Sequence, residues 1–170
     1  GGGGGGGKTS GNSSGNFSVS ADIVSDITQN KAEVGTKPFI DIDSVPWAEE
    51  SIVALEKKGV ISGREKMKFE PNESVTREEF VKMIVTSLGI EVEDAECSFD
   101  DVFESDWYYP YVANAYTAGI INGVTEQFFG SGTDITREEM AVIIYRAAEF
   151  VGEHLEYGAY SFHDNSSISE

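Results

Sequence analysis

The chain has 170 residues, and its 30 acidic residues against 12 Lys and Arg give a formal net charge of −18. This charge excludes binding to a nucleic acid backbone, which requires clustered cations, so we predict no nucleic acid partner. No apolar stretch of about 18 residues is present, which argues against a signal peptide and against membrane insertion of the given chain. A single cysteine, Cys97, excludes an internal disulfide bond.

Residues 1–38 begin with seven glycines, followed by a stretch rich in Ser, Gly and Asn. Such a composition offers too little apolar surface to offset the entropy that ordering removes. We interpret residues 1–38 as a linker and N-terminal arm that behaves as a flexible tether. We also expect the chain to be a fragment of a longer protein, with an attached domain and any export signal upstream.

The remainder of the chain repeats itself with an offset of sixty residues. The recurring positions keep one register without an insertion, which predicts a module of about 55 residues. In the first copy they are Phe39, Trp47, Gly59, Gly63, Phe69 and Thr76-Arg77-Glu78-Glu79. In the second copy they are Phe99, Trp107, Gly119, Gly123, Phe129 and Thr136-Arg137-Glu138-Glu139.

These matches set the predicted boundaries. Repeat 1 occupies residues 39–90, a linker occupies 91–98, and repeat 2 occupies 99–152. Residues 153–170 are interpreted as a linker and the start of a third repeat, because Phe162-His163-Asp164 matches Phe39-Ile40-Asp41.

Each repeat is predicted to contain two helices joined by a tight turn. The first helix extends from Ser44 to Gly59 in repeat 1 and from Trp107 to Gly119 in repeat 2, with a proline in each first turn. In the turn, two aliphatic residues separate glycines four positions apart, which favours left-handed or closely approached backbone.

The second helix is predicted to begin at Thr76 in repeat 1 and at Thr136 in repeat 2. A glutamate follows each threonine by three positions, which is the capping-box pattern. Because every predicted element is helical, we predict an all-α fold of tandem helix-loop-helix repeats.

Arg77 and Arg137 lie in the first turn of these helices, where a cation opposes the helix dipole. Two interpretations are open. Each arginine can form a salt bridge to a nearby acid, including one in the neighbouring repeat, or it can join the free N–H groups of the helix N-terminus in binding a carboxylate or phosphate. Under the second interpretation, Arg77→Ala and Arg137→Ala should fold normally and bind ligand more weakly.

Trp47 and Trp107 also have two interpretations, as core residues or as platforms for a sugar ring. Taken alone, the sequence favours the core. Phe69 and Phe129 are predicted to lie in the core. Three neighbouring tyrosines are predicted to pack while partly exposed: Tyr108, Tyr109 and Tyr111.

No catalytic or metal-binding pattern accompanies these residues. The chain has no Gly-x-Ser-x-Gly motif, no His pair at metal-ligand spacing and no phosphate-binding loop. Asp41-Ile42-Asp43 and Asp100-Asp101 lack the remainder of a calcium-binding loop. We therefore predict no catalysis, no cofactor and no metal site.

The repeated pattern Phe-x-Asp, Trp, Gly-Val/Ile-Ile-x-Gly and Val/Ile-Thr-Arg-Glu-Glu resembles the S-layer homology (SLH) domain family. The resemblance covers residues 39–90 and 99–152, and the start of a third copy near the C-terminus. The sequence departs from the family's Ile-Thr-Arg-Ala-Glu hallmark at Glu78 and Glu138. The resemblance implies a pseudo-threefold all-helical assembly, with one helix of each repeat in a central bundle and the others forming prongs.

The resemblance also implies a non-catalytic, extracellular module that holds a surface or S-layer protein on the cell wall. The implied partner is secondary cell wall polysaccharide, often bearing ketal-linked pyruvate. Because the chain is itself acidic, recognition has to depend on local groups rather than on net charge. The residues at matching positions imply a carbohydrate-binding set, in which the two aspartates are sugar-binding or structural: Trp47, Gly63, Arg77, Trp107, Gly123, Arg137, Asp41 and Asp101.

The alternative function is a self-assembly domain whose repeats contact neighbouring subunits in a surface lattice. A threefold bundle with only two complete repeats would leave an apolar flank uncovered. We expect that flank to cause self-association or, less favourably, to be covered by residues 17–28.

Overall fold

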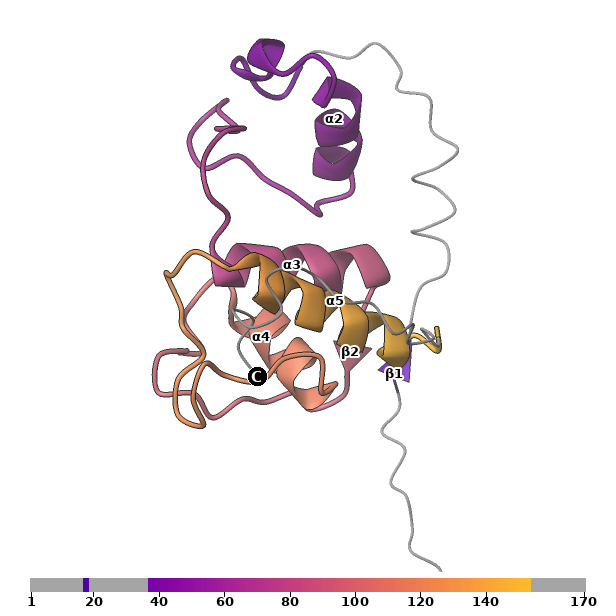
Figure 1. The fold of residues 1–170 in the computed structure, drawn as a ribbon, viewed down its shortest axis with the longest axis vertical. Coiled ribbons are helices and arrows are strands. Elements are labelled where there is room, and N and C mark those ends of the chain that lie inside the picture. The colour runs from indigo at the N-terminus through magenta and orange to yellow at the C-terminus, as the bar shows by residue number, and fades with distance from the viewer. Residues whose placement is uncertain (1–16, 19–36, 154–170) are drawn as a thin grey trace, which may run out of the picture.

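The computed structural model describes residues 17–18 and 37–153 of the chain (Figure 1). The elements in chain order are β1 (Phe17–Ser18), the 3-10 helix η1 (Ile42–Ser44), α2 (Glu49–Lys57), α3 (Arg77–Leu88), β2 (Glu91–Val92), α4 (Tyr109–Thr117) and α5 (Arg137–Phe150). The prediction of an all-α fold is confirmed, apart from the two short strands. None of the described helices combines the length and the apolar character that crossing a membrane requires.

The second helix of each repeat begins where the sequence predicts. Thr76 precedes α3, and its hydroxyl accepts a hydrogen bond from the Glu79 N–H while the Glu79 carboxylate accepts one from the Thr76 N–H at 2.9 Å. Thr136 and Glu139 form the same reciprocal pair before α5. The two capping boxes satisfy backbone donors that the helix itself leaves without partners.

The first helix of each repeat begins later than predicted. In repeat 1 the chain forms η1 and a turn before α2 starts at Glu49, so Pro46 precedes the helix instead of lying in its first turn. In repeat 2, α4 starts at Tyr109 and holds Pro110 in its first turn, as predicted. Neither helix has a side-chain cap, and this explains why its beginning carries a weaker sequence signal than the capping boxes do.

The paired glycines of the turns have two different roles. Gly59 and Gly119 have φ angles of +70° and +72°, a left-handed conformation in which glycine is favoured. Gly63 and Gly123 are instead sites of close approach, because a Cβ atom there would collide with backbone oxygens of Lys68 or of Thr125 and Phe128. The sequence predicted both kinds of constraint, and the structure assigns one to each glycine.

The apolar residues form two separate clusters, and their division does not follow the sequence repeats. The smaller cluster contains the first half of repeat 1 only: Phe39, Ile42, Ile52, Val60 and Ile61. The larger cluster combines repeat 2 with the second helix of repeat 1, which contributes Val81 and Val85. The packing unit is therefore offset by half a repeat from the sequence unit.

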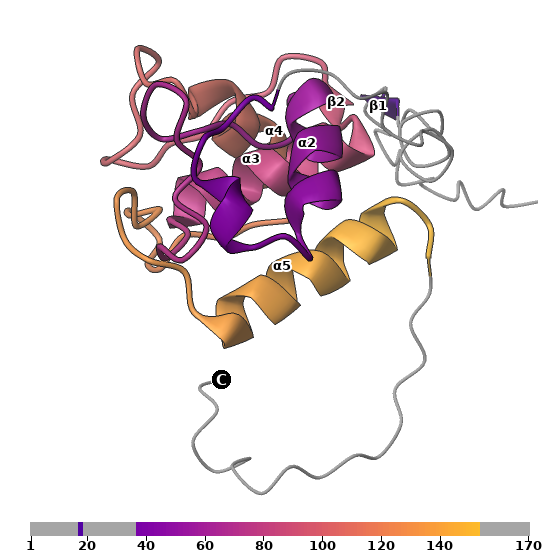
Figure 2. The ribbon, with the colours of Figure 1, turned by 90° about the horizontal axis from the view of Figure 1, so that it is seen from above.

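Helix contacts give the same result. α3 packs most extensively against α4 of the next repeat and also contacts α5. Figure 1 shows α2 apart from the group formed by α3, α4 and α5, and Figure 2 shows from above that α2 lies over α3 while α5 runs beside the group. The backbone joins the repeats too, since the Arg77 N–H donates to the Thr133 carbonyl at 2.9 Å and the Ile135 N–H to the Val75 carbonyl at 3.1 Å.

Two predictions concern the chain ends, namely the covering segment at residues 17–28 and the start of a third repeat, and the described residues include only Phe17 and Ser18 of these segments. Phe17 and Ser18 pair antiparallel with Val92 and Glu91 as a two-stranded sheet, which the sequence did not predict. The remainder of the proposed covering segment, residues 19–28, lies outside the described residues, as does the predicted start of a third repeat. The pseudo-threefold arrangement accordingly stays a prediction.

Candidate functional site: a groove in repeat 1

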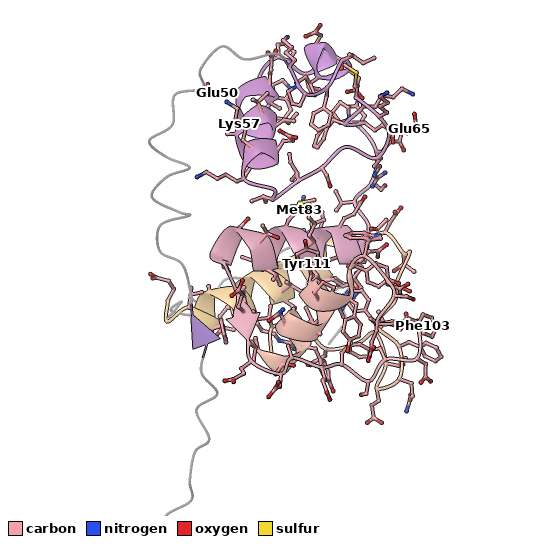
Figure 3. The ribbon with its side chains drawn as sticks, turned by 180° about the vertical axis from the view of Figure 1, so that it is seen from behind. Glu50, Lys57, Glu65, Met83, Phe103 and Tyr111 are labelled. Atoms are coloured by element: carbon pink, nitrogen blue, oxygen red, sulfur yellow. The ribbon has the colours of Figure 1, made fainter. Side chains whose placement is uncertain are left out.

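A groove of about 580 Å³ lies in repeat 1, between α2 and α3. One wall is formed by α2 and the turn that follows it, and the other by α3, whose Met83 points toward α2 in Figure 3. Trp107 of repeat 2 also lines the groove, so both repeats contribute to it. The lining is mostly apolar, with the polar and charged groups Ser51, Ser62, Arg64, Glu70, Glu73, Glu79 and Lys82.

Lys82 is the cation in the groove that has no acidic partner. Its ammonium donates a hydrogen bond to the Ser62 hydroxyl at 3.3 Å, and it forms no ion pair within residues 37–153. Burial lowers the pKa of Lys82 below its usual value of 10.5, and the charge of Glu79 only partly opposes that effect. A partly dehydrated ammonium in an open groove has the charge to attract a small anion.

Arg64 has its partners already. Its Nε donates to Glu79 Oε1 at 3.0 Å and its Nη2 to Glu79 Oε2 at 2.6 Å, which is a bidentate pair. The same Nη2 also donates to the Ser74 carbonyl. Arg64 therefore neutralises the Glu79 carboxylate and fixes the wall of the groove, while Lys82 remains open to a ligand.

The counterpart of this groove in repeat 2 is filled by Arg77. The Arg77 Nη1 donates to Glu139 at 2.8 Å, its Nη2 donates to the Asn122 carbonyl at 3.1 Å, and its guanidinium carbon lies 5.2 Å from the centre of the Phe129 ring. These three partners correspond by the sixty-residue register to Glu79, Ser62 and Phe69, which all line the groove of repeat 1. These contacts show that the Arg77 side chain occupies, in repeat 2, the space that is an open groove in repeat 1.

For Arg77 the structure favours the salt bridge to an acid of the neighbouring repeat. Its side chain is only 7% exposed, and its partner Glu139 belongs to repeat 2. Burial lowers the pKa of Arg77, against the opposing charge of Glu139. Arg137, by contrast, is exposed at the start of α5. The two arginines thus occupy equivalent positions in the sequence and different environments in the fold.

The interpretation of the tryptophans as core residues is wrong. Trp47 is 85% exposed and Trp107 is 56% exposed. Trp107 lies edge-on to Tyr108, with ring centres 5.4 Å apart, and its indole lines the groove. Trp47 is not part of the groove lining, so the groove brings together Trp107 and Gly63 from the predicted carbohydrate-binding set. The partly exposed packing predicted for the neighbouring tyrosines is confirmed.

Phe69 and Phe129 lie where the sequence placed them, although to different degrees. Phe129 is fully buried, and Phe69 is partly buried against the smaller cluster. Phe129 packs against Phe99 with ring centres 5.9 Å apart, and Phe69 packs against Phe39 at 5.4 Å. The greater exposure of Phe69 follows from the open groove above it, which α3 fills in repeat 2.

Asp41 and Asp101 act on the backbone of their own repeats. Asp101 accepts hydrogen bonds from the N–H groups of Phe129, Gly130 and Ser131 at 2.8–2.9 Å, and Asp41 accepts from Phe69 and Glu70. The bond from Phe69 is the main cause of the lowered pKa of Asp41. Burial opposes ionisation of Asp101, but its backbone hydrogen bonds outweigh that effect and its pKa is also lowered.

Sequence reasoning missed Arg64 and Lys82, because it looked for positions that recur. The counterparts of these residues in repeat 2 are Val124 and Val142. The signal in the sequence that could have identified them is a difference between the copies, because repeat 1 has two cations where repeat 2 has two valines. Among residues 17–18 and 37–153, no group of three or more His, Cys, Asp or Glu side chains is placed to hold a metal ion.

Comparison with known proteins gives the family. The S-layer homology domain matches residues 38–81 and 98–141. Similar proteins include an endoglucanase of Bacillus sp. (strain KSM-635), 34% identical over 82% of this chain and 15% of its own length. An amylopullulanase of Thermoanaerobacterium thermosulfurigenes is 39% identical over 79% of this chain and 7% of its own length.

A third similar protein is an S-layer protein of Bacillus thuringiensis subsp. finitimus, 33% identical over 76% of this chain and 16% of its own length. The chain therefore spans a small part of the curated relatives it matches, and the same part recurs in proteins with different names. The two matched segments overlap the two repeats that share capping boxes, glycine turns and aspartate contacts, and they end within α3 and α5. The chain belongs to the S-layer homology domain family.

Proposed function

We propose that this chain is a non-catalytic anchoring module that binds secondary cell wall polysaccharide outside the cell and tethers the protein to which it belongs. Its family supports the anchoring role, because S-layer homology domains occur both in S-layer proteins and in polysaccharide-degrading enzymes. A module shared by proteins of such different names supplies a common property, and attachment to the cell surface is the property that both kinds require.

The observation that carries the proposal is the open groove of repeat 1, to which Trp107 of repeat 2 also contributes. Its volume of about 580 Å³ is within the range of small-ligand sites. The groove combines the indole of Trp107, on which the apolar face of a sugar ring can pack, with hydroxyl and charged groups that can bind sugar oxygens. Gly63 keeps the backbone close at the groove wall, where a side chain would collide with neighbouring atoms.

The finer proposal is that the bound polysaccharide carries ketal-linked pyruvate. A pyruvyl group presents one carboxylate on a compact ketal, and the groove has a cation without an ion pair to receive it. Glu70 and Glu73 also line the groove, so the ligand carboxylate has to approach from the side of α3. Local geometry, rather than the charge of −18, then decides binding.

A sedimentation assay with purified cell walls tests the proposal. We expect the chain to bind walls that carry the polysaccharide and to lose binding on walls from which the polymer has been extracted. Trp107→Ala should weaken binding about tenfold, as expected for removing an aromatic platform of about 1–2 kcal/mol. Trp47→Ala is the matched control, because Trp47 lies outside the groove.

Two outcomes would contradict the proposal. Equal binding to extracted walls would mean that the chain recognises another wall component. Equal loss in Trp47→Ala and Trp107→Ala would mean that the groove is not the binding site. Incubation of the chain with wall polysaccharide should release no reducing sugar, because we propose no catalytic role for this module.

A second candidate, self-assembly, is favoured by the exposed face of α5. Arg77, Glu78 and Val81 are buried where α3 meets repeat 2. Their counterparts on α5 are all exposed: Arg137, Glu138 and Ala141. Val142 and Ile144 extend this face with exposed fractions of 45% and 50%. α5 therefore presents the same kind of surface that α3 packs against the next repeat. In a dimer, repeat 1 of a second copy can pack against this face of α5.

Analytical ultracentrifugation tests this candidate. The chain should associate reversibly in the micromolar range, and Ile144→Glu should shift it to the monomer. Ile40→Glu is the control, since Ile40 is also exposed but belongs to repeat 1 and not to the face of α5. Monomeric behaviour of the unmodified chain at all concentrations would exclude association through this face.

A further inference from the structure

We propose that the chain has one site for an acidic saccharide, not one in each repeat, and that Lys82 binds the saccharide carboxylate. This inference rests on the proposed function and adds to it the number of sites and the residue that selects for charge. It follows from comparing the two copies of the groove position by position.

The first step is that the groove of repeat 2 is already occupied. Arg77 contacts the counterparts of three groove residues: a glutamate, a carbonyl of the turn and a phenylalanine ring. The residues that correspond to Ala48 and Ser51 of the groove are the larger Tyr108 and Tyr111. A ligand would have to displace a buried, hydrogen-bonded guanidinium to enter, which leaves Glu139 without its partner.

The second step is that the cations differ between the copies. Repeat 1 has Arg64 and Lys82 at positions where repeat 2 has Val124 and Val142. In repeat 2 the incoming Arg77 binds Glu139, whereas in repeat 1 Arg64 binds the equivalent Glu79. Arg64 thus does for repeat 1 what a side chain of the preceding helix does for repeat 2. Arg64 therefore pairs the Glu79 carboxylate without filling the groove.

The third step is that Lys82 is the cation left for a ligand. The Arg64 guanidinium is held by Glu79 and by the Ser74 carbonyl, so its donors on that side are occupied. Within residues 37–153 the Lys82 ammonium has one hydrogen bond, to the neutral Ser62 hydroxyl, and at least two further donor directions. Trp107 lines the same groove. A sugar ring against the indole with a carboxylate toward Lys82 uses both groups at once.

The test is titration calorimetry with a defined compound, a methyl hexoside carrying a ketal-linked pyruvate, and with the methyl ester of the same ketal. The ester keeps the shape and removes the charge. We expect one site per chain for the acid, and an affinity for the acid that exceeds that for the ester by about tenfold, the magnitude of one hydrogen bond between charged groups. A stoichiometry of two acids per chain would overturn the proposal.

Three variants sharpen the result. Lys82→Gln should lose the preference for the acid over the ester and retain binding of the ester. Arg137→Gln removes the same charge from an exposed position, and it should keep the preference. Val142→Lys restores a cation in repeat 2 at the position of Lys82, and it should create no second site, because Arg77 fills the groove there. Circular dichroism would confirm that each variant is folded.

The outcomes separate this inference from the proposed function. If Lys82→Gln keeps the full preference for the acid, or if Val142→Lys adds a site, the inference is wrong although wall binding can still stand. The same conclusion applies if the chain binds walls through their polysaccharide but has no preference for the acid. If the unmodified chain fails to bind polysaccharide-bearing walls at all, both the function and the inference are wrong.

Discussion

Repeat 1 and repeat 2 share a scaffold but differ in what occupies the space between their helices. Both have a capping box, a left-handed glycine in the turn and an aspartate that accepts hydrogen bonds from the following loop. In repeat 2 that space holds Arg77 of the preceding helix, whereas in repeat 1 it is an open groove. Two copies of one motif thus surround a buried ion pair in one case and an open groove in the other.

The difference shows that position in the array, and not the motif alone, decides the role of a residue. Arg77 and Arg137 have identical local sequences over Thr-Arg-Glu-Glu. Arg77 is followed in space by a complete repeat and becomes buried, while Arg137 is exposed on the described part of the chain. A function carried over by motif therefore needs a check of what lies next to each copy.

The largest effect expected from this comparison is on the two arginines. Arg77→Ala should lower the free energy of unfolding by about 3 kcal/mol, because Glu139 loses its buried ion-pair partner at Oε1 and the Asn122 carbonyl loses a donor. Arg137→Ala should change it by less than about 0.5 kcal/mol, as is usual for an exposed position. Urea unfolding of both variants measures the difference. If the two variants lose unfolding free energies that agree within about 0.5 kcal/mol, the Arg77–Glu139 contact does not stabilise the fold, and the ligand-binding interpretation of Arg77 would be favoured again.

The aspartates should give the next largest effect. Asp101→Ala should cost about 2 kcal/mol, since three buried or partly buried N–H groups lose their acceptor, and Asp41→Ala should cost less because Asp41 serves fewer donors. Thermal unfolding at neutral pH measures both changes. A larger loss for Asp41→Ala would mean that the loop of repeat 1 depends more on this contact than its geometry indicates.

The same aspartate gives a defined dependence on pH. The pKa of Asp101 is lowered in the folded chain, so its contribution is complete above its usual pKa of 3.8 and is lost as the pH falls through the folded value. The stability difference between the unmodified chain and Asp101→Ala should therefore narrow on acidification. A difference that stays constant down to pH of about 2 would show that the carboxylate charge is not what binds the loop.

The smallest effect concerns Lys82. Lys82→Val, which introduces the repeat 2 residue, should raise the unfolding free energy by at most about 0.5 kcal/mol, because the site is partly solvated. Its lowered pKa means that the folded chain disfavours the charged form, so the contribution of Lys82 to stability should rise slightly with pH up to about 10.5. Lys37 and Lys68, whose pKa values are raised, act in the opposite direction, so the rise should be seen in the stability of the unmodified chain relative to Lys82→Val. A clear destabilisation at neutral pH would instead give Lys82 a structural role.

Much of the fold could be predicted because its signals are local. The Thr-x-x-Glu pattern fixes the start of α3 and α5 through bonds between residues three apart, and glycine in the turn reports a backbone angle at a single residue. The two-residue strands have no comparable signal, since neither is long enough to show an alternation of apolar and polar residues.

The site was predicted less well because its determinants are not local. Sequence reasoning could name a neighbouring acid as the partner of Arg77, but Glu139 is separated from it by 62 positions. For Trp107 the sequence left a core position and a sugar platform open and taken alone favoured the core, and only the fold shows that Trp107 lines the groove of the other repeat. Lys82 was overlooked because attention to recurring positions hides the positions at which the copies differ.

The offset between the sequence repeat and the packing unit determines where this module can be divided and grafted. A junction in the linker at residues 91–98 keeps each sequence repeat whole, but it removes α3 from α4 and exposes Val81 and Val85. A junction in the loop before Val75 keeps α3 with α4 and α5 and cuts fewer apolar contacts, although it separates Arg64 from Glu79 and Met83 from the smaller cluster. We therefore expect chimaeras joined before Val75 to keep the larger cluster folded, and chimaeras joined in the linker to aggregate.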